Sequence, residues 1–494
     1  MIVIDWLKVQ QQLLYDAKNP LLFNSGFFIY FLFFFIICYF LVRKQNNLRA
    51  LVLALFSLYF FYKASGLFVG LVIGTSIVNF GLSNLIFILK NQVHKKIVLV
   101  ASIVCNLGVL FYFKYTNFAI DLINSYSTLH FNALHLILPI GISFYTFENL
   151  SYTVDVYKNE IAPEKKIVNY MLFLSFFPKL VMGPIVRAKD FIPQLKKPYF
   201  VSETDFSAGF YLIISGLIKK LIISDYVALN LVNYVFDGPN LHNGFECLMA
   251  MYGYAIVIYC DFSGYSDVAI GISKWLGITI PANFLSPYQS TSISEFWRRW
   301  HISLSSWLRD YLYIPLGGNK GGTIRTNVNL FLTMVIGGFW HGASFNFIIW
   351  GALHGFGLII NKIWSSMFAN LQLQYVSKKL STLVFGLITF HFVCFCWIFF
   401  RASDLQTALQ FINQIRYQFT FTNSLTFLQN YKITLVMIGV GFIMHLIPDS
   451  WATLFIERQK CFSMIYFIII TFLFLLLYSY FKSAQTVMPI YLQF

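Results

Sequence analysis

The chain has 494 residues, of which 58% are hydrophobic and 11% are charged, and its mean hydropathy is +0.67. A soluble domain carries about 25% charged residues, so this composition indicates a polytopic membrane protein. The formal net charge of +15 fits cytoplasmic loops that obey the positive-inside rule and contact anionic lipid headgroups. Because the sequence contains no soluble basic domain, nucleic acid is excluded as a partner.

The N-terminal residues 1–18 are expected to form an interfacial amphipathic helix that ends near Asn19 and Pro20. This segment lacks a basic n-region and a small-residue cleavage site, so it does not read as a signal peptide. The seven cysteines are an odd number and show no CxxC pair or Cys/His metal spacing, which predicts no metal site. Four cysteines that fall inside apolar runs are expected to be buried, reduced thiols: Cys38, Cys105, Cys394 and Cys396.

Apolar runs follow one another along most of the chain and predict a single all-α integral-membrane domain, 1–494. We expect about ten to twelve membrane helices, some of them re-entrant. The run at 168–186 is interrupted at Phe176–Lys179 and at Gly183–Pro184, and such breaks persist at membrane depth only where protein buries them or a cavity borders them. The runs lie near 26–42, 50–64, 66–89, 97–119, 168–186, 207–230, 245–260, 328–360, 381–400, 433–447 and 463–481.

Basic residues after the first and third runs predict the orientation of the chain. The positive-inside rule places both of these loops in the cytoplasm and the N-terminus outside. Two further basic clusters are also interpreted as cytoplasmic, whereas the charges beyond residue 360 do not alternate and leave that part unoriented. The loop residues are Arg43, Lys44, Arg49, Lys90, Lys95 and Lys96, and the further clusters are Arg187, Lys189, Lys196 and Lys197, then Arg298, Arg299, Arg309, Lys320 and Arg325.

Ser294 to Tyr313 is predicted to be an amphipathic helix with His301 on its aromatic face. Trp297, Trp300, His301, Leu304, Trp307, Leu308 and Tyr311 recur at spacings of three and four residues. Imidazole titrates near neutral pH and can take and return a proton. His301 is therefore a candidate catalytic group; the equal alternative is a histidine that merely hydrogen-bonds a carbonyl while the tryptophans anchor the interface.

His341 lies within Phe331–Ile360, an almost uncharged run that is long enough to cross a bilayer. A titratable ring at that depth is costly unless it faces a cavity or a partner. Neighbouring glycines at 337, 338 and 342 permit a helix or a substrate to approach, which favours a site over a histidine that only hydrogen-bonds across helices. His354 would face about 220° away on an ideal helix and is interpreted as a packing residue or a support for the site.

The segment Asp261–Asp267 supplies two carboxylates that could orient a histidine, although a structural polar kink is the more probable explanation on residue physics alone. Gly317–Gly322 is a basic glycine-rich loop whose backbone amides could bind a phosphate. The Walker pattern is missing, so the sequence gives this site little support. The sequence contains no GxSxG, HExxH, dinucleotide-binding or haem-attachment motif. Serine hydrolases, zinc proteases and dinucleotide enzymes therefore have no support.

Several motifs of the chain, including those around His301 and His341, resemble motifs of the membrane-bound O-acyltransferase family, most closely those of its bacterial alginate O-acetylase branch. The resemblance covers roughly residues 138–360, which we expect to form the catalytic core. Its residues are Phe296–Ser305, Trp307–Tyr313, Gly317–Asn319 and Gly338–Gly342, together with Leu138–Tyr145, Phe177–Pro178, Gly183–Pro184, Asp261–Asp267, Pro281–Phe284 and Ser286–Tyr288.

The resemblance implies an all-helical enzyme with opposed cytoplasmic and external cavities, in which His341 and His301 carry the catalysis. It further implies no bound cofactor and a donor substrate that is either acetyl-CoA or an acylated carrier protein. The acceptor would be a polysaccharide hydroxyl, and an extracytoplasmic acetyltransferase partner would complete the transfer to it. The enzyme would lie in the bacterial inner membrane. Residues expected to support the site or the substrate path are Trp340, Trp300, Asp310, Asp261, Asp267, Tyr265 and Asn283, and weaker candidates for binding the donor are Arg298, Arg299, Arg309 and Lys320.

A transporter or flippase with a polar midplane path is the competing class. It predicts paired inverted repeats with corresponding broken helices, and no such repeat is evident in the sequence. Either alginate, another exopolysaccharide or peptidoglycan would fit as the acceptor of an acyltransferase.

Overall fold

The computed structural model describes residues 11–23, 25–367, 378–482 and 487–492. Within these ranges the protein is entirely helical and has no strand, as predicted. Its contacts divide the chain into two compact units: the first comprises Met1–Gly209 and Ala269–Pro281, and the second Phe210–Val268 and Ala282–Phe494. Two of the three boundaries fall inside helices, α11 and α14, and the third follows Pro281 in the loop before η5. The single-domain organisation remains a prediction.

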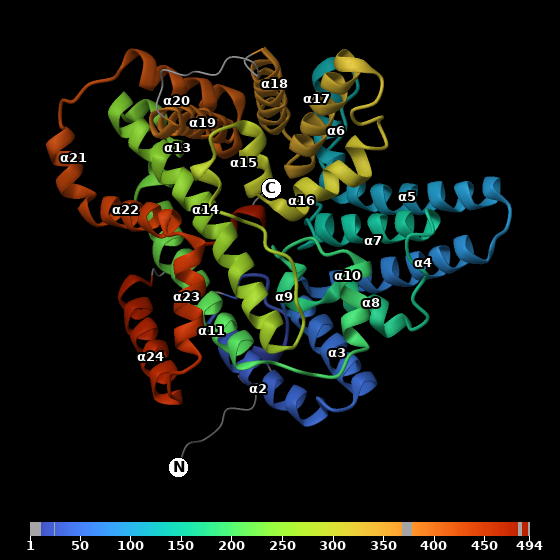
Figure 1. The fold of residues 1–494 in the computed structure, drawn as a ribbon. Coiled ribbons are helices and arrows are strands. Elements are labelled where there is room, and N and C mark those ends of the chain that lie inside the picture. Colours follow the sequence, from blue (N-terminus) through green and yellow to red (C-terminus); the bar gives the residue numbers. More distant parts are fainter. Residues whose placement is uncertain (1–10, 24, 368–377, 483–486, 493–494) are drawn as a thin grey trace. The chain divides into compact units, whose positions relative to one another are not determined.

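The first unit consists of short and long helices that carry most of the N-terminal apolar runs (Figure 1). In chain order they are α2 (Gly26–Val42), α3 (Asn46–Ser65), η1 (Gly66–Phe68), α4 (Val69–Ile88), α5 (Gln92–Lys114), α6 (Thr116–Tyr126), α7 (Ile142–Tyr157), α8 (Ile167–Ser175), α9 (Phe177–Leu180), α10 (Ala188–Leu195) and the start of α11 (Glu203–Leu217).

The second unit contains the histidine motifs. Its first elements are η2 (Ile218–Ser224), α12 (Asp225–Val227), η3 (Ala228–Val232), α13 (Asn233–Asp237), η4 (Pro239–Leu241), most of α14 (Gly244–Trp275), η5 (Pro287–Gln289), α15 (Ile293–Arg299), α16 (Ile302–Leu308) and η6 (Arg309–Tyr313). There follow α17 (Gly322–His341), α18 (Phe345–Met367), α19 (Lys378–Arg401), α20 (Leu405–Tyr417), α21 (Ser424–Asn430), α22 (Lys432–Leu446), α23 (Asp449–Gln459), α24 (Met464–Phe481) and η7 (Ile490–Leu492).

Seven helical segments in the described ranges are long and apolar enough to cross a membrane, or up to eight if the bent pair formed by α21 and α22 counts as one. The predicted count of ten to twelve is not confirmed. Two predicted runs, 50–64 and 66–89, fall within one segment of 43 residues, Asn46–Ile88, and α2 is shorter than the length such a span needs. The other six segments are Gln92–Lys114, Glu203–Asp237, Gly244–Trp275, Phe345–Met367, Lys379–Arg401 and Met464–Phe481.

The predicted N-terminal amphipathic helix lies mostly outside the described residues, since the description begins at residue 11. Residues 11–13 are helical, and turns follow up to Asn19. The helix therefore does not continue to residue 18 as expected. Asp16 accounts for this early end, because its carboxylate accepts the N–H of Lys18 at 2.9 Å and the side-chain amide of Asn19 at 2.9 Å, a local turn that competes with helix.

The predicted interruption of the run at 168–186 is present and is buried. Helix α8 ends at Ser175, and Phe176 and Phe177 at the break have no exposed surface. Next to the break, the Lys179 ammonium donates to the Glu148 carboxylate on α7, and the N–H of Val186 donates to the same carboxylate at 3.1 Å. Polar groups freed by the break therefore find partners inside the protein, as burial requires.

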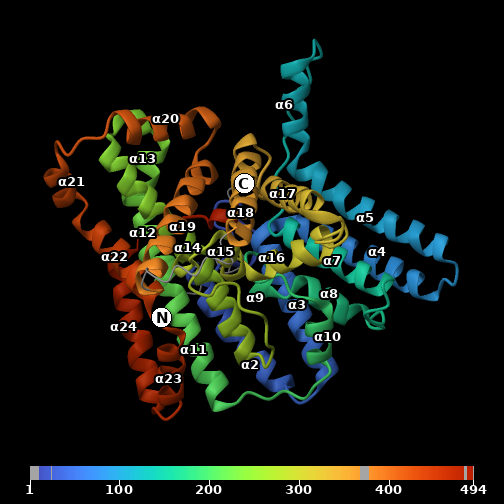
Figure 2. The ribbon, with the colours of Figure 1, turned by 45° about the horizontal axis from the view of Figure 1, so that its top comes forward.

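Helices α4 and α5 run side by side in Figure 2 and share a buried polar contact with α7. The side-chain amides of Asn79 and Asn106 exchange hydrogen bonds of 3.1 and 2.7 Å, and the Ser102 hydroxyl donates to Asn79 at 2.7 Å. Interhelical hydrogen bonds of this kind help to hold apolar helices together where no hydrophobic force drives their association. Both helices otherwise expose apolar side chains, which suits contact with lipid.

The single run predicted at 328–360 is two helices in the structure. Helix α17 ends at His341, and α18 begins at Phe345 and packs along it. A Cβ added to Gly338 would lie 2.3 Å from the Phe347 carbonyl oxygen, and one added to Gly351 would lie 2.4 Å from the Met334 carbonyl oxygen. Gly338 thus allows the close approach of α18, whereas Gly337 faces Leu308 of α16.

The prediction for the cysteines is confirmed in part. All seven are free, and Cys394 and Cys396 are buried. Cys105 is exposed on α5 and Cys38 is only partly buried, so the apolar runs that contain them do not imply burial within the protein. An apolar helix surface can face lipid instead.

We expect Gly351→Ala to destabilise the folded protein, because the new methyl group would overlap the backbone of α17. Overpacking of this kind costs about 1–3 kcal/mol, which exceeds the gain of about 1 kcal/mol in helix propensity. The measurement is the thermal unfolding of purified protein in detergent. Gly386→Ala is the matched control, since a Cβ at Gly386 in α19 meets nothing within 4 Å; equal melting temperatures for the two variants would contradict the close packing of α17 and α18.

Candidate active site

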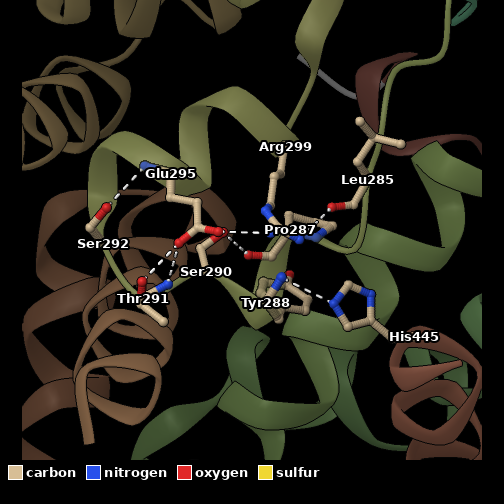
Figure 3. A network of polar contacts seen from close by, with 9 residues as sticks. All are labelled: Leu285, Pro287, Tyr288, Ser290, Thr291, Ser292, Glu295, Arg299 and His445. Carbon is tan, nitrogen blue, oxygen red and sulfur yellow. Dashed lines mark hydrogen bonds and ion pairs between the residues drawn. The ribbon is translucent and has the colours of Figure 1, made fainter. Parts of the chain in front are cut away.

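The loop before α15 is fixed by one carboxylate, that of Glu295 (Figure 3). Its Oε2 atom accepts the N–H of Thr291 at 2.8 Å and the Thr291 hydroxyl at 2.9 Å, and Ser292 caps the helix by accepting the N–H of Glu295 at 3.1 Å. This arrangement is close to a capping box, in which a cap residue and the acid three positions later satisfy the first N–H groups of a helix. Helix α15 therefore starts at a defined residue.

Arg299 closes the same network at the other end of α15 (Figure 3). Its guanidinium pairs with Glu295 at 2.7 Å and donates to the Leu285 carbonyl at 3.4 Å, and the N–H of Leu285 donates to the Arg299 carbonyl at 3.0 Å. The N–H of Tyr288 in the same loop donates to Nε2 of His445 at 3.0 Å. These contacts fix the loop relative to α15, and they therefore also fix the position of the next two residues, Trp300 and His301.

His301 lies at a break between two helices. The prediction of one continuous helix over Ser294–Tyr313 is wrong: α15 ends at Arg299, and α16 begins at Ile302. His301 has φ +43° and ψ +54°, a left-handed conformation that is uncommon for a residue with a side chain. It is fully buried. Strained backbone of this kind is found at functional sites, where the surrounding structure enforces it.

Asn283 determines which nitrogen of His301 carries the proton. Its amide oxygen accepts the N–H of Ser303 at 3.3 Å and the Ser303 hydroxyl at 2.7 Å, and lies 3.1 Å from Nδ1 of His301. Because this oxygen can only accept, Nδ1 carries the hydrogen and Nε2 keeps a lone pair. Nε2 is buried and has no hydrogen-bond partner among the described residues. Burial lowers the pKa of His301 to about 3, so the ring is neutral and Nε2 can accept a proton or a hydrogen bond.

His341 is the last residue of α17, 5% exposed, and aromatic rings surround it. The centroid of its ring lies 4.9 Å from that of Trp340, 5.1 Å from Trp350 and 5.3 Å from Phe400. Such walls exclude water and weaken the screening of charge. Trp340 packs against His341 as expected, whereas Trp300 packs against Phe284, Phe296, Tyr288 and Trp397.

Tyr491, near the C-terminus, contacts both histidines. Its ring centroid lies 5.4 Å from that of His341 and 6.1 Å from that of His301. The N–H of the preceding residue, Ile490, donates to Asp261 at 2.9 Å, and the same carboxylate accepts from the Lys220 ammonium. The sequence analysis missed this segment. The apolar residues 487–492 after the last predicted helix were a weak signal, and no local pattern indicates a contact across 229 positions.

The carboxylates that were expected to orient a histidine have other partners. Asp267 pairs with Lys219 at 2.7 Å, and Asp310 pairs with Arg309 at 2.8 Å. The hydrogen-bond partner of His301 is Asn283. Asp261 and Asp267 lie with the buried Tyr265 on α14, which is helical throughout Gly244–Trp275. The segment therefore does not interrupt the helix. Buried carboxylates here neutralise the lysines of η2, which burial makes necessary.

A cavity of about 890 Å³ lies beside α15 and α16. Arg298, Arg309 and Asn319 line it, whereas Arg299 and Lys320 do not; Arg299 belongs to the network of Figure 3. Neither His301 nor His341 is among the lining residues, although Ile302, Trp297 and Met334 are. Most of the cavity surface is apolar, and hydroxyl and amide side chains are distributed along it: Ser292, Ser294, Ser305, Ser306, Thr326, Thr333, Asn361 and Ser365, with Lys362 as a third cation.

His354 is also buried, and its Nδ1 accepts the indole N–H of Trp297 at 3.3 Å. Its ring lies 4.8 Å from that of Trp350, which in turn contacts His341. His354 belongs to α18 and not to one helix through 328–360, so the predicted rotation of about 220° from His341 is wrong. It supports the wall of the cavity through Trp297. In the described part of the chain, no group of three or more His, Cys, Asp or Glu side chains could hold a metal ion.

The sequence model of the membrane-bound O-acyltransferase family matches residues 159–402. A peptidoglycan O-acetyltransferase of Helicobacter pylori is 36% identical over 420 residues, which cover 79% of this chain and 79% of that protein. The chain belongs to the membrane-bound O-acyltransferase family. The matched residues include both histidines, Asn283 and the cavity, and the recognition from motifs is confirmed.

Two further relatives of this O-acyltransferase differ in what their names say they act on. A probable alginate O-acetylase of Pseudomonas aeruginosa is 44% identical over 314 residues, 63% of this chain and 58% of that protein. A teichoic acid D-alanyltransferase of Bacillus subtilis is 30% identical over 281 residues, 54% of this chain and 70% of that protein. Membership in the family sets the transporter alternative aside.

We expect Asn283→Leu to lower the rate of acyl transfer, because His301 would lose the bond that fixes its tautomer. A lost hydrogen bond of about 1 kcal/mol corresponds to roughly a fivefold fall in rate. Asn283→Asp should restore the bond and, by placing a negative charge beside the ring, raise the pKa of His301 and move the acidic limb of the pH profile upwards. Ser273→Ala, buried on α14, is the control; identical pH profiles for wild type and Asn283→Asp would argue against this positioning role.

Proposed function

We propose that this O-acyltransferase, a multi-pass protein of the bacterial inner membrane, moves an acetyl group from a cytoplasmic thioester to a hydroxyl outside the membrane. The observation that carries the proposal is the pair of buried histidines around one phenol, with a basic and hydroxyl-rich cavity in the same unit. The acetylases among the relatives support an acetyl group. The final acceptor is a polysaccharide, reached with an extracytoplasmic partner protein.

The donor occupies the cavity beside α15 and α16. Arg298, Arg309 and Lys362 supply positive charge, which suits the phosphates that acetyl-CoA and a phosphopantetheine-bearing carrier protein share. Serine and threonine hydroxyls along the wall can hydrogen-bond the amides of the pantetheine arm. Arg299 and Lys320, which do not line the cavity, take no part in this binding. Ile302, which follows His301, also lines the cavity, so we place the thioester at that part of the wall.

His341 is the general base in this mechanism. Its neutral imidazole removes a proton from the acceptor hydroxyl, the oxygen attacks the thioester carbonyl, and the imidazolium returns the proton to the departing thiolate. A base of this kind contributes about 10²–10⁴-fold to the rate. His301 has a positioning role: its ring packs against the Tyr491 ring and orients the phenol, whose single proton goes to His341. A neutral ring in this tautomer has no Nε2 proton to offer an oxyanion, so oxyanion stabilisation is not assigned to it.

Tyr491 places a hydroxyl-bearing ring against both histidines, and we infer that this phenol accepts the acetyl group first. The phenol oxygen would attack the thioester, its proton would pass to His341, and the thiol would leave, so that the chain carries an aryl ester. An aryl ester is a reactive acyl donor, from which a partner protein can complete the transfer to the polysaccharide. Asp261 and Lys220 support this step by holding the backbone of Ile490.

We expect His341→Ala to lower the consumption of radiolabelled acetyl-CoA, or of an acetylated carrier protein, by at least about 100-fold, because the base is lost. The assay uses protein purified in nanodiscs, with folding checked by thermal unfolding. His391→Ala is the control, since His391 is an exposed histidine of α19. A well-folded His341→Ala protein that retains transfer would refute the assignment, and turnover of neither donor by wild type would refute the proposed chemistry.

Tyr491→Phe keeps the ring but removes the hydroxyl, so we expect the chain to lose its capacity to become acetylated. Intact-mass measurement after incubation with the donor would show one added acetyl group on wild type and none on Tyr491→Phe. Tyr466→Phe, in α24, is the matched control and should be acetylated like wild type. An acetyl group on Tyr491→Phe, or none on an active wild-type protein, would contradict the phenol as acceptor.

A further inference from the structure

The first unit contains a second cavity that the acyltransferase reaction does not use. Its volume is about 730 Å³, and it is formed by the start of α3, the segment between α7 and α8, and α10. The start of α3 and α10 belong to segments for which the positive-inside rule or a basic cluster predicts a cytoplasmic position. The structure joins them: Asn46 donates to the Lys196 carbonyl at 2.9 Å, and Arg49 donates to the Lys197 carbonyl at 2.7 Å.

Four lysines line this cavity, Lys165, Lys166, Lys189 and Lys196, against one carboxylate, Glu164. Glu164 is buried, pairs with Lys196 at 2.8 Å and accepts the N–H groups of Lys165 and Lys166 at 3.0 Å each. The remaining three lysines have no described carboxylate within ion-pair distance. Glu164 therefore organises the loop, and the cavity keeps an excess of positive charge.

Asparagines and apolar side chains complete the lining. Asn46, Asn47 and Asn169 offer amide groups, and the Lys166 ammonium already donates to Asn47 at 2.7 Å. The apolar part of the wall comprises Ile161, Ala162, Pro163, Ile192, Pro193 and Leu195. A ligand that fits this lining has a phosphate at one end and an apolar portion next to it.

Helix α3 continues the apolar surface away from the cavity. Its exposed leucines, Leu48, Leu51 and Leu55, recur at spacings of three and four residues and so lie on one face of the helix. They are 39%, 40% and 59% exposed. An acyl chain can lie along this row while its headgroup remains at Asn46 and Asn47, where α3 begins.

We propose that this cavity binds the headgroup of an anionic phospholipid. Basic pockets between membrane helices on the cytoplasmic side bind such headgroups, and each lysine near an anionic surface contributes about 1 kcal/mol. The concave shape and the neighbouring leucine row favour a lipid over an acidic protein, which would need a flat or convex surface. Binding at this site is independent of the acyl-transfer chemistry.

The test compares two variants that remove the same charge. Lys165→Gln, Lys166→Gln and Lys189→Gln together empty the cavity of its unpaired cations, whereas Lys90→Gln, Lys95→Gln and Lys96→Gln remove three cations from another loop predicted to be cytoplasmic. Native mass spectrometry of purified protein titrated with phosphatidylglycerol measures the bound lipid. We expect the first variant to bind it about 100-fold more weakly, the factor that corresponds to three contributions of about 1 kcal/mol each, and the second to bind it like wild type.

Three controls keep the outcome decisive. Phosphatidylcholine should not replace phosphatidylglycerol, and inorganic phosphate should displace it only at much higher concentration; displacement by phosphate at equal concentration would make the ligand a free phosphate and overturn the lipid. If the triple variant does not fold, Lys189→Gln alone, on the exposed side of α10, replaces it. Equal loss of binding in the cavity variant and in the Lys90, Lys95 and Lys96 variant would overturn the site.

Discussion

The structure around the histidines depends on the side-chain amide of Asn283. This amide donates to Ser266 on α14 and accepts from Ser303 and from Nδ1 of His301, so one residue connects three segments. A buried polar group without a partner costs several times what a satisfied hydrogen bond contributes. The left-handed turn at His301 therefore persists because it lets the Asn283 amide form all of these hydrogen bonds. In the same arrangement Nε2 of His301 has no hydrogen-bond partner among the described residues and can contact a substrate.

Buried charged groups, like buried amides, need partners. Lys219 and Lys220 lie on η2 and find Asp267, Asp261 and Asp225 within the same unit. Asp261 has a second oxygen available, and the backbone of Ile490 uses it. An ion pair that neutralises a membrane protein's interior thus also fixes the segment that brings Tyr491 to the reaction centre. Asp261 therefore has a role that neither alternative from the sequence included: it pairs with the buried Lys220 and holds the backbone next to Tyr491.

Sequence patterns predicted the helical class and the family, because composition and motif chemistry are local properties; the catalytic roles of His301 and His341 stay a prediction. The patterns did not predict the break at His301, since the spacing of Trp297, His301 and Leu304 is perfectly helical and only Asn283, 18 positions away, makes the turn favourable. The split between α17 and α18 escaped notice because Gly342–Ser344 sits inside an unbroken apolar run. Tyr491 could not be placed, because its neighbours His301 and His341 are distant in the chain.

The most direct test of the account is a cryo-EM structure of the protein with a non-hydrolysable thioether analogue of the acetyl donor. The account predicts that the pantetheine arm lies in the cavity lined by Arg298 and Arg309. It also predicts that the acyl carbon lies about 3–3.5 Å from the Tyr491 oxygen, as a near-attack geometry requires, with His341 beside that oxygen and His301 still bonded to Asn283. An acyl group held away from both histidines, or a His301 released from Asn283, would contradict it.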